Sequence, residues 1–121
     1  MYRFGQRSKD NFKGVNPDLI GIAYRALQLS PHDFGITEGL RTIERQRELF
    51  AAKKSQTMNS RHLTGEAIDF AVWKGGTVVW DFPLYQEVAE AFKRAAAEYG
   101  LKITWGGDWK FRDGPHIQLE K

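Results

Sequence analysis

From Ser60 to Val72 the chain reads SRHLTGEAIDFAV, and this segment carries the clearest signals of both the sheet and the site. Its second half alternates between two faces, as the side chains of a β-strand do: the apolar face carries Ile68, Phe70 and Val72, and the other carries Ala67, Asp69 and Ala71. The apolar face predicts packing against helices. The opposite face places a carboxylate between two small side chains, which predicts room for a metal ion beside Asp69. Gly65 permits a sharp turn between the loop that holds His62 and this strand.

A second stretch near the C-terminus repeats the alternation. Residues 113–119 read DGPHIQL, so His116 and Gln118 share one face of a short strand, and two apolar residues share the other. Asp113 begins a turn, and the proline that follows suits the start of a strand because it cannot donate to a sheet. We therefore expect Asp113 to lie one tight turn from His116, close enough to share a site.

The rest of the chain reads as helices joined to short strands. Asn16 can cap a helix whose first position is Pro17, and that helix ends at Ser30. Further helices are expected over 42–53 and 84–99, and strands over 34–37, 77–80 and 102–105. In the helix over 42–53, Gln46 points the same way as the apolar residues. This order predicts an α+β fold with a small, mainly antiparallel sheet, helices packed on one face and the metal site on the other.

Length, cysteine content and charge exclude several classes of protein and of site. The 121 residues predict one catalytic domain over 1–121, with no separate cell-wall-binding domain. The absence of cysteine excludes disulfides, thiolate metal sites and a cysteine nucleophile. We expect no signal peptide and no stable membrane association, because no apolar run approaches the roughly 20 residues of a spanning helix. The net charge of +3 suits an acidic partner, or else marks only a solvated basic surface.

The ligand types point to a metal. Two imidazoles and one carboxylate, from His62, His116 and Asp69, form a nitrogen and oxygen set that suits Zn²⁺. Three protein ligands leave a fourth position for water, as catalytic zinc sites do. Asp113 is placed to act as the base that takes a proton from that water, and later as the acid for a leaving amine. Taken singly, each residue would more often be a surface histidine or a paired carboxylate.

Together, these residues resemble a known family. The pattern S-x-H-x-x-G-x-A-x-D followed by D-x-x-H is similar to the zinc D-Ala-D-Ala carboxypeptidases and dipeptidases (peptidase family M15), which include the L-alanyl-D-glutamate endopeptidases of phages. The resemblance implies that His62, Asp69 and His116 bind zinc and that Asp113 is the catalytic base. Dipeptidases of the family usually carry Glu at the position of Asp113, so the aspartate favours the endopeptidase branch.

Two further segments carry the resemblance. Residues 39–46, GLRTIERQ, match a G-x-R-[ST]-x-x-x-Q segment, which implies that Arg41 stabilises the oxyanion and that Arg41 and Gln46 contact substrate. Residues 105–109, WGGDW, resemble the endolysin branch, and Trp105 and Trp109 either line a substrate groove or belong to the core. Ser60, which opens the first motif, is expected to contact substrate as well.

The resulting hypothesis is an endolysin-like zinc metallopeptidase that hydrolyses the L-alanyl-D-glutamate bond of peptidoglycan stem peptides during host lysis. We expect a monomer that is made in the host cytoplasm and acts at the cell wall, in the periplasm, after membrane permeabilisation. Three alternatives stay open: a D-Ala-D-Ala carboxypeptidase or dipeptidase, a catalytically silent zinc-bound binding module, and a small nucleic-acid-binding domain. No cluster of Lys and Arg or known motif supports the last, so no nucleic-acid partner is expected.

Overall fold

The computed structural model describes residues 2–55 and 57–120, which form four α-helices and one open antiparallel sheet of five strands. In chain order the elements are α1 (Gln6–Asn11), α2 (Pro17–Leu29), β1 (Asp33–Glu38), α3 (Ile43–Ala51), β2 (Ala67–Lys74), β3 (Thr77–Val79), α4 (Phe82–Glu98), β4 (Lys102–Trp105) and β5 (His116–Glu120). Two short 3-10 turns, η1 (Arg61–Thr64) and η2 (Gly106–Asp108), precede β2 and follow β4. This architecture confirms the predicted α+β class.

The sheet has the order β1-β2-β5-β4, and β3 pairs with β2 beside its later residues. β2 therefore occupies the middle, with β1 along one side and β5 along the other. The register of the β2–β5 pair sets Asp69 directly opposite His116. Residues that face each other in an antiparallel pair project to the same side of the sheet, so the sheet itself brings these two side chains together.

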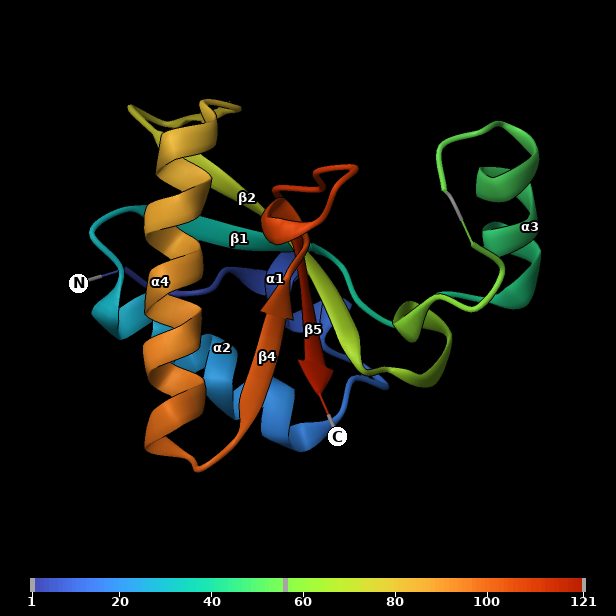
Figure 1. Ribbon diagram of the computed structural model, residues 1–121. Coiled ribbons are helices and arrows are strands. Elements are labelled where there is room, and N and C mark those ends of the chain that lie inside the picture. The colour runs from blue at the N-terminus through green and yellow to red at the C-terminus, as the bar shows by residue number, and fades with distance from the viewer. Residues whose placement is uncertain (1, 56, 121) are drawn as a thin grey trace.

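The core lies between one face of the sheet and the helices α2 and α4, which pack against each other and against the strands (Figure 1). The alternation in β2 is as predicted, because Ile68, Phe70 and Val72 are fully buried. Phe70 contacts the rings of Phe34 and Phe92 at centroid distances of 5.7 and 5.6 Å. The helices thus cover one face, which leaves Asp69 and His116 on the other.

Helix α1 was not expected from the sequence, and it covers the free edge of β1. The hydroxyl of Ser8 accepts from the backbone N–H of Ile36 at 2.9 Å, and the Asn11 amide donates to the Ile36 carbonyl at 2.8 Å. These bonds occupy backbone groups that no neighbouring strand reaches. α1 has only six residues and no side-chain cap, so its sequence carries little helical signal.

Helix α3 stands apart from α2 and α4 at the far side of the molecule (Figure 1). Its predicted apolar face is wrong, because Ile43 and Phe50 are 47% and 46% exposed. The buried residue of this helix is instead the polar Gln46. Hydrogen bonds of the Gln46 side chain connect α3 to Arg41, Ser55 and the Thr57 carbonyl.

No helix in the described part of the chain combines the length and the hydropathy that crossing a membrane would require.

Candidate metal centre and active-site cleft

An open cleft of about 800 Å³ lies on the sheet face opposite α2 and α4. Asp69 and His116 form part of its floor, and its walls come from the loop after α3 and from the loop between η2 and β5. The two alanines that flank Asp69 in β2 do not line it, since Ala67 and Ala71 are themselves buried. The expected room beside Asp69 therefore exists, but loops bound it rather than the alanine methyl groups.

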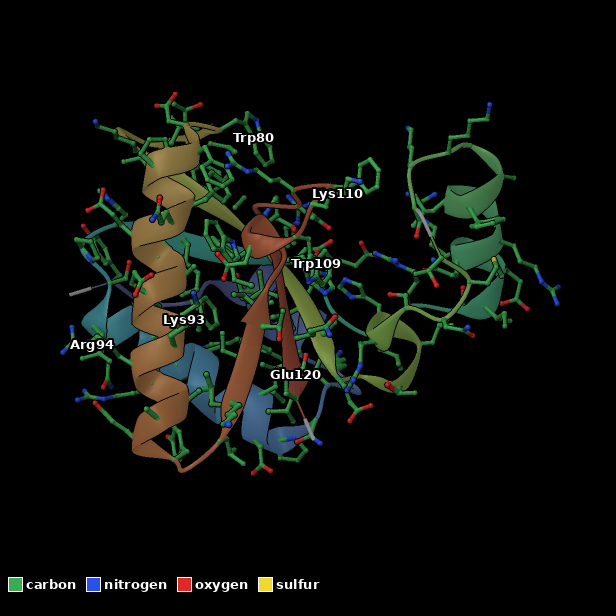
Figure 2. The ribbon with its side chains drawn as sticks, viewed as in Figure 1. Trp80, Lys93, Arg94, Trp109, Lys110 and Glu120 are labelled. Carbon is green, nitrogen blue, oxygen red and sulfur yellow. The ribbon has the colours of Figure 1, made fainter. Side chains whose placement is uncertain are left out.

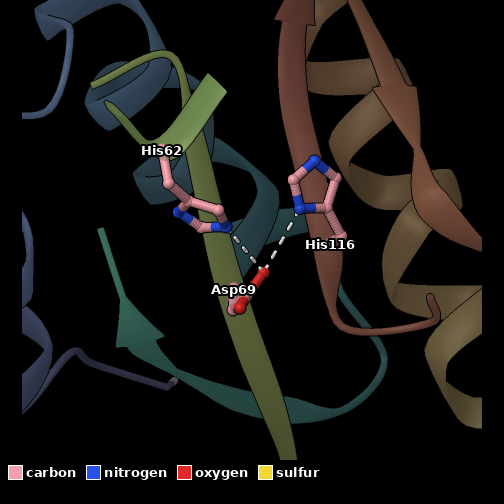
Figure 3. Close-up of side chains that lie close together, drawn as sticks. All are labelled: His62, Asp69 and His116. Carbon is pink, nitrogen blue, oxygen red and sulfur yellow. Dashed lines mark hydrogen bonds and ion pairs between the residues drawn. The ribbon is translucent and has the colours of Figure 1, made fainter. Parts of the chain in front are cut away.

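Three potential metal ligands converge in this cleft (Figure 3). The Nε2 atom of His62 lies 3.1 Å from Oδ1 of Asp69, and the Nδ1 atom of His116 lies 3.4 Å from the same oxygen. One ligand atom from each of the three residues falls within 4.8 Å of the others. His62 comes from η1, Asp69 from β2 and His116 from β5, so a turn and two paired strands position the set.

The orientation of the His62 ring follows from its outer contact. Its Nδ1 lies 2.8 Å from the carbonyl oxygen of Gly39, an atom that can only accept, so Nδ1 carries a proton. The opposite nitrogen, Nε2, faces Asp69. The turn that places the ring ends at Gly65, whose φ of 75° lies in the left-handed region that favours glycine. The predicted sharp turn ahead of β2 is therefore present.

The His116 ring is oriented by a longer chain of hydrogen bonds. The amide nitrogen of Gln118 donates to Glu120 at 2.9 Å, which turns the amide oxygen toward His116. That oxygen lies 3.0 Å from Nε2 of His116, so Nε2 is the donor and Nδ1 faces Asp69. Metal-binding histidines are commonly held by such an outer hydrogen bond, which fixes the tautomer.

The electrostatics favour a charged Asp69. Burial opposes ionisation, but hydrogen bonds from His116 and His62 hold the pKa of the Asp69 carboxyl well below its ordinary value. Burial acts to lower the pKa of His116, and the hydrogen bond with Asp69 outweighs it and raises that pKa. In the metal-free protein a proton on an imidazole therefore stabilises the cluster, which is the role a cation would take over.

The donor set fits a divalent metal ion. The outer hydrogen bonds of His62 and His116 leave one unprotonated ring nitrogen of each facing Asp69. Two such nitrogens and an ionised carboxylate form a donor set typical of catalytic zinc sites. Neutral imidazoles facing a carboxylate repel it unless a proton or a cation lies between them. His62, Asp69 and His116 are thus the residues that would hold the ion.

Arg41 lies beside this cluster, with its side chain 8% exposed. Its Nη2 atom is 3.9 Å from Oδ2 of Asp69, and its backbone N–H donates to the His62 carbonyl at 2.8 Å. Burial acts to lower the pKa of Arg41, but the hydrogen bonds to Glu38 raise it, so the guanidinium stays charged. The structure therefore sets a cation on the cleft wall within reach of the predicted metal site.

Asp113 also lines the cleft, in the loop that precedes β5. Its carbonyl accepts from the His116 N–H at 3.1 Å, which is the tight turn expected from the sequence. Burial, and then the charge of Asp69, raise the pKa of the Asp113 carboxyl. This loop packs so closely on Gly106 that a Cβ there would collide with the Asp113 carbonyl and with the His116 side chain.

The remaining predicted site residues divide into two groups. Trp109, which Figure 2 labels, and Ser60 line the cleft. The Trp109 ring lies 4.9 Å from that of His116, and the Ser60 hydroxyl accepts from the His62 N–H at 3.2 Å. Trp105 instead belongs to the core: it is 2% exposed, and its indole donates to the Gly114 carbonyl at 2.7 Å. Gln46 is fully buried, and its amide bonds Arg41, Ser55 and Thr57. Its placement favours support of Arg41 over direct contact with substrate.

Sequence reasoning missed three supporting groups: Glu38, the Gly39 carbonyl and Gln118. Glu38 stands immediately before the segment 39–46 that contains Arg41, Gly39 is the first residue of that segment, and Gln118 shares a strand face with His116. That shared face was the available signal for Gln118. Nothing local marks a backbone carbonyl as the partner of a histidine distant in the chain.

Comparison with known proteins finds relatives over almost the whole chain. The family model described as "Phage L-alanyl-D-glutamate peptidase" matches residues 1–120. The chain is 36% identical over 124 residues to the L-alanyl-D-glutamate peptidase of Escherichia phage T5, which covers 99% of this chain and 90% of the relative. The structure of this chain is similar to the crystal structure of the Serratia marcescens L-Ala D-Glu endopeptidase ChiX, with a TM-score of 0.92 and 45% identity. The match covers 99% of this chain and 90% of that chain.

A more distant likeness concerns the fold alone. The vancomycin-resistance D,D-dipeptidase VanXYg, solved in complex with a D-Ala-D-Ala phosphinate analogue, has a TM-score of 0.57 at 20% identity, covering 87% of this chain and 50% of that chain. This fold likeness and the near relatives agree with the resemblance drawn from the two sequence motifs. The match of a family model to almost the whole chain establishes that it belongs to the phage L-alanyl-D-glutamate peptidase family.

Proposed function

We propose that this chain is a zinc-dependent endopeptidase that hydrolyses the L-alanyl-D-glutamate bond of peptidoglycan stem peptides. The observation that carries the proposal is the convergence of His62, Asp69 and His116 within 4.8 Å on the floor of an open cleft. Asp113 and Arg41 stand on the walls of the same cleft. The family and the names of the relatives supply the bond that is cleaved.

Each side chain has a distinct task in this reaction. When bound by the three ligands, zinc supplies a Lewis acid that polarises the scissile carbonyl and makes water a nucleophile at neutral pH. The Asp113 carboxylate accepts a proton from the attacking water and passes it to the nitrogen of the leaving D-Glu amine. Its raised pKa suits both halves of that transfer. Arg41 donates to the oxygen of the scissile carbonyl as negative charge develops there.

Substrate binding is assigned to the cleft walls. Trp109 presents a half-exposed ring beside His116, where it can pack on the stem peptide, and Ser60 lies on the opposite wall. The stem peptide carries carboxylates, so the net charge of +3 favours its approach. We further propose that the protein acts as a monomer, in the periplasm, and reaches the wall after another protein has permeabilised the membrane.

Digestion of purified peptidoglycan tests the proposal. The protein, stripped with a chelator and reloaded with zinc, should release fragments whose new ends are an L-Ala carboxylate and a D-Glu amine, as identified by mass spectrometry. Cleavage should disappear with the chelator and return with zinc. Asp113→Asn loaded with zinc serves as the matched inactive control.

Other products would point to the alternatives. Release of free D-Ala or of the dipeptide D-Ala-D-Ala would assign the chain to carboxypeptidase or dipeptidase chemistry. Zinc-loaded protein that binds peptidoglycan without cutting it would identify a binding module.

A further inference from the structure

A β-bulge in β1 carries Glu38 to the metal side of the sheet. Up to Ile36, β1 and β2 pair regularly, with Ile36 opposite Phe70, but Glu38 then pairs with Asp69. Continued regular pairing would set Glu38 opposite Ile68, whose side chain lies in the core. The extra residue is Thr37. A bulge of this kind re-aims a side chain, and bulges are frequent beside active sites.

On that side of the sheet, Glu38 forms a bidentate contact with the guanidinium of Arg41. Its two carboxylate oxygens accept from Nε at 2.7 Å and from Nη2 at 2.9 Å, the paired geometry that fixes a guanidinium plane. On the other side, Nη1 donates to the amide oxygen of Gln46 at 2.6 Å. Arg41 has five N–H groups, so these bonds leave one on Nη1 and one on Nη2 for a ligand in the cleft.

The same pair of residues balances charge. Glu38 offsets the cation of Arg41, which itself lies 3.9 Å from the Asp69 carboxylate. With Nε and one N–H of Nη2 paired to Glu38, the remaining N–H groups of Arg41 act mainly as oriented hydrogen-bond donors. Donors that need no reorganisation stabilise a developing oxyanion most effectively. Side-chain freedom at Arg41 would lose that advantage, because an arginine has several rotatable bonds.

We propose that Glu38 is a positioning residue that fixes the Arg41 guanidinium so that its free N–H groups point at the scissile carbonyl oxygen. This role rests on the proposed endopeptidase function. Glu38 does not itself contact the reacting atoms; it acts through Arg41, and the bulge at Thr37 is the backbone device that makes this possible.

The test compares Glu38→Gln with a matched Arg–Glu pair remote from the cleft. Arg25 and Glu98 form the same two-point contact, at 2.7 and 3.2 Å, between exposed faces of α2 and α4. Glu38→Gln should lower kcat on stem peptides by about 10- to 100-fold with little change in KM, the loss typical when an outer partner that orients a metal ligand is removed. Glu98→Gln should leave both constants at the wild-type level. Zinc content should be the same in all three proteins.

A double-mutant cycle shows whether Glu38 acts through Arg41. In an Arg41→Ala background, Glu38→Gln should cause no further loss of kcat, because the group it positions is gone. Losses that multiply would overturn the proposal, since Glu38 would then act on its own. Wild-type kcat in Glu38→Gln, or a change confined to KM, would overturn it as well.

A second readout does not depend on activity. The Nε–H proton of Arg41 should give a solvent-protected signal in ¹⁵N-resolved NMR spectra of the wild type and of Glu98→Gln, and should lose that protection in Glu38→Gln. Protection retained in Glu38→Gln would contradict the positioning role. If the wild type cut no stem peptide while this pattern held, the endopeptidase function would fail and the orientation of Arg41 by Glu38 would stand.

Discussion

The Nδ1 atom of His62 lies 2.8 Å from the carbonyl oxygen of Gly39, and this one contact decides which ring nitrogen faces the cleft. Because the carbonyl only accepts, Nδ1 keeps its proton and Nε2 is left to face Asp69 at 3.1 Å. Gly39 follows Glu38 and lies two residues before Arg41. A short stretch of backbone thus orients both a metal ligand and the cation beside it.

Removal of His62 should abolish zinc binding. His62→Ala leaves two of three ligands, so isothermal titration with zinc should show the high-affinity site lost and peptidoglycan cleavage absent. His32→Asn is the matched control, since His32 lies against Glu87 at 3.3 Å and outside the cleft. It should bind zinc as the wild type does. Equal zinc affinity in both variants would show that the metal binds elsewhere.

Asp113→Asn should separate metal binding from catalysis. The amide cannot take a proton from water, so kcat/KM should fall by about 10²- to 10⁴-fold while zinc stays bound. Asp108→Asn provides the comparison, because Asp108 lies in the neighbouring turn η2 and pairs with Lys93 at 3.0 Å. It should keep wild-type activity. Retained activity in Asp113→Asn would remove this residue from the base role.

In the metal-free protein, Asp69 and His116 should together contribute most to stability between the ordinary pKa values of aspartate and histidine, 3.8 and 6.5. The pKa of Asp69 is lowered on folding, so its contribution is present above 3.8 and lost as pH falls through the folded pKa. That of His116 is raised, so its contribution is present below 6.5 and lost as pH rises through the folded pKa. Urea unfolding of chelator-treated protein across this range measures the profile.

Asp69→Asn is the control for that profile. Without the carboxylate, both shifts lose their partner, so the dependence of the unfolding midpoint on pH should flatten. An unchanged profile in this variant would mean that other groups set the pH dependence.

The two tryptophans that flank η2 should respond oppositely to truncation. Trp105 is 2% exposed, so Trp105→Ala should lower the free energy of unfolding by about 3–5 kcal/mol. Trp109 is 38% exposed, so Trp109→Ala should change stability little but reduce kcat/KM on stem peptides. Thermal unfolding and steady-state kinetics on both variants check this. A Trp109→Ala variant with wild-type kinetics would exclude that ring from substrate binding.

The parts of the fold that could be predicted are those with a local period. Alternation in β2 and β5 places Asp69 and His116 on the face away from the core, and the structure has both there. Helices α2 and α4 carry clear start signals, including a proline in the first turn of each. These features depend on residues close in sequence, so one sequence suffices to find them.

What escaped prediction depends on tertiary context. The bulge at Thr37 arises from how β1 and β2 pair, and no residue in β1 predicts it from the sequence. Gln46 is buried because the Ser55 hydroxyl and the Thr57 carbonyl lie against its amide, while its apolar neighbours Ile43 and Phe50 remain exposed. Trp105 and Trp109 sit in one short motif, yet only the path of the chain sends one inward and the other to the cleft.

The pairing of β2 with β5 has a consequence for how the protein folds. Asp69 and His116 meet across strands that the chain forms far apart in sequence, and contacts of that kind form slowly because a long loop must close first. A metal ion held by both strands and by His62 would cross-link the two ends of this loop. Disulfides do the same in other small proteins, but this chain has no cysteine. Metal loading would then slow unfolding, so resistance to proteolysis and not turnover alone would depend on the ion.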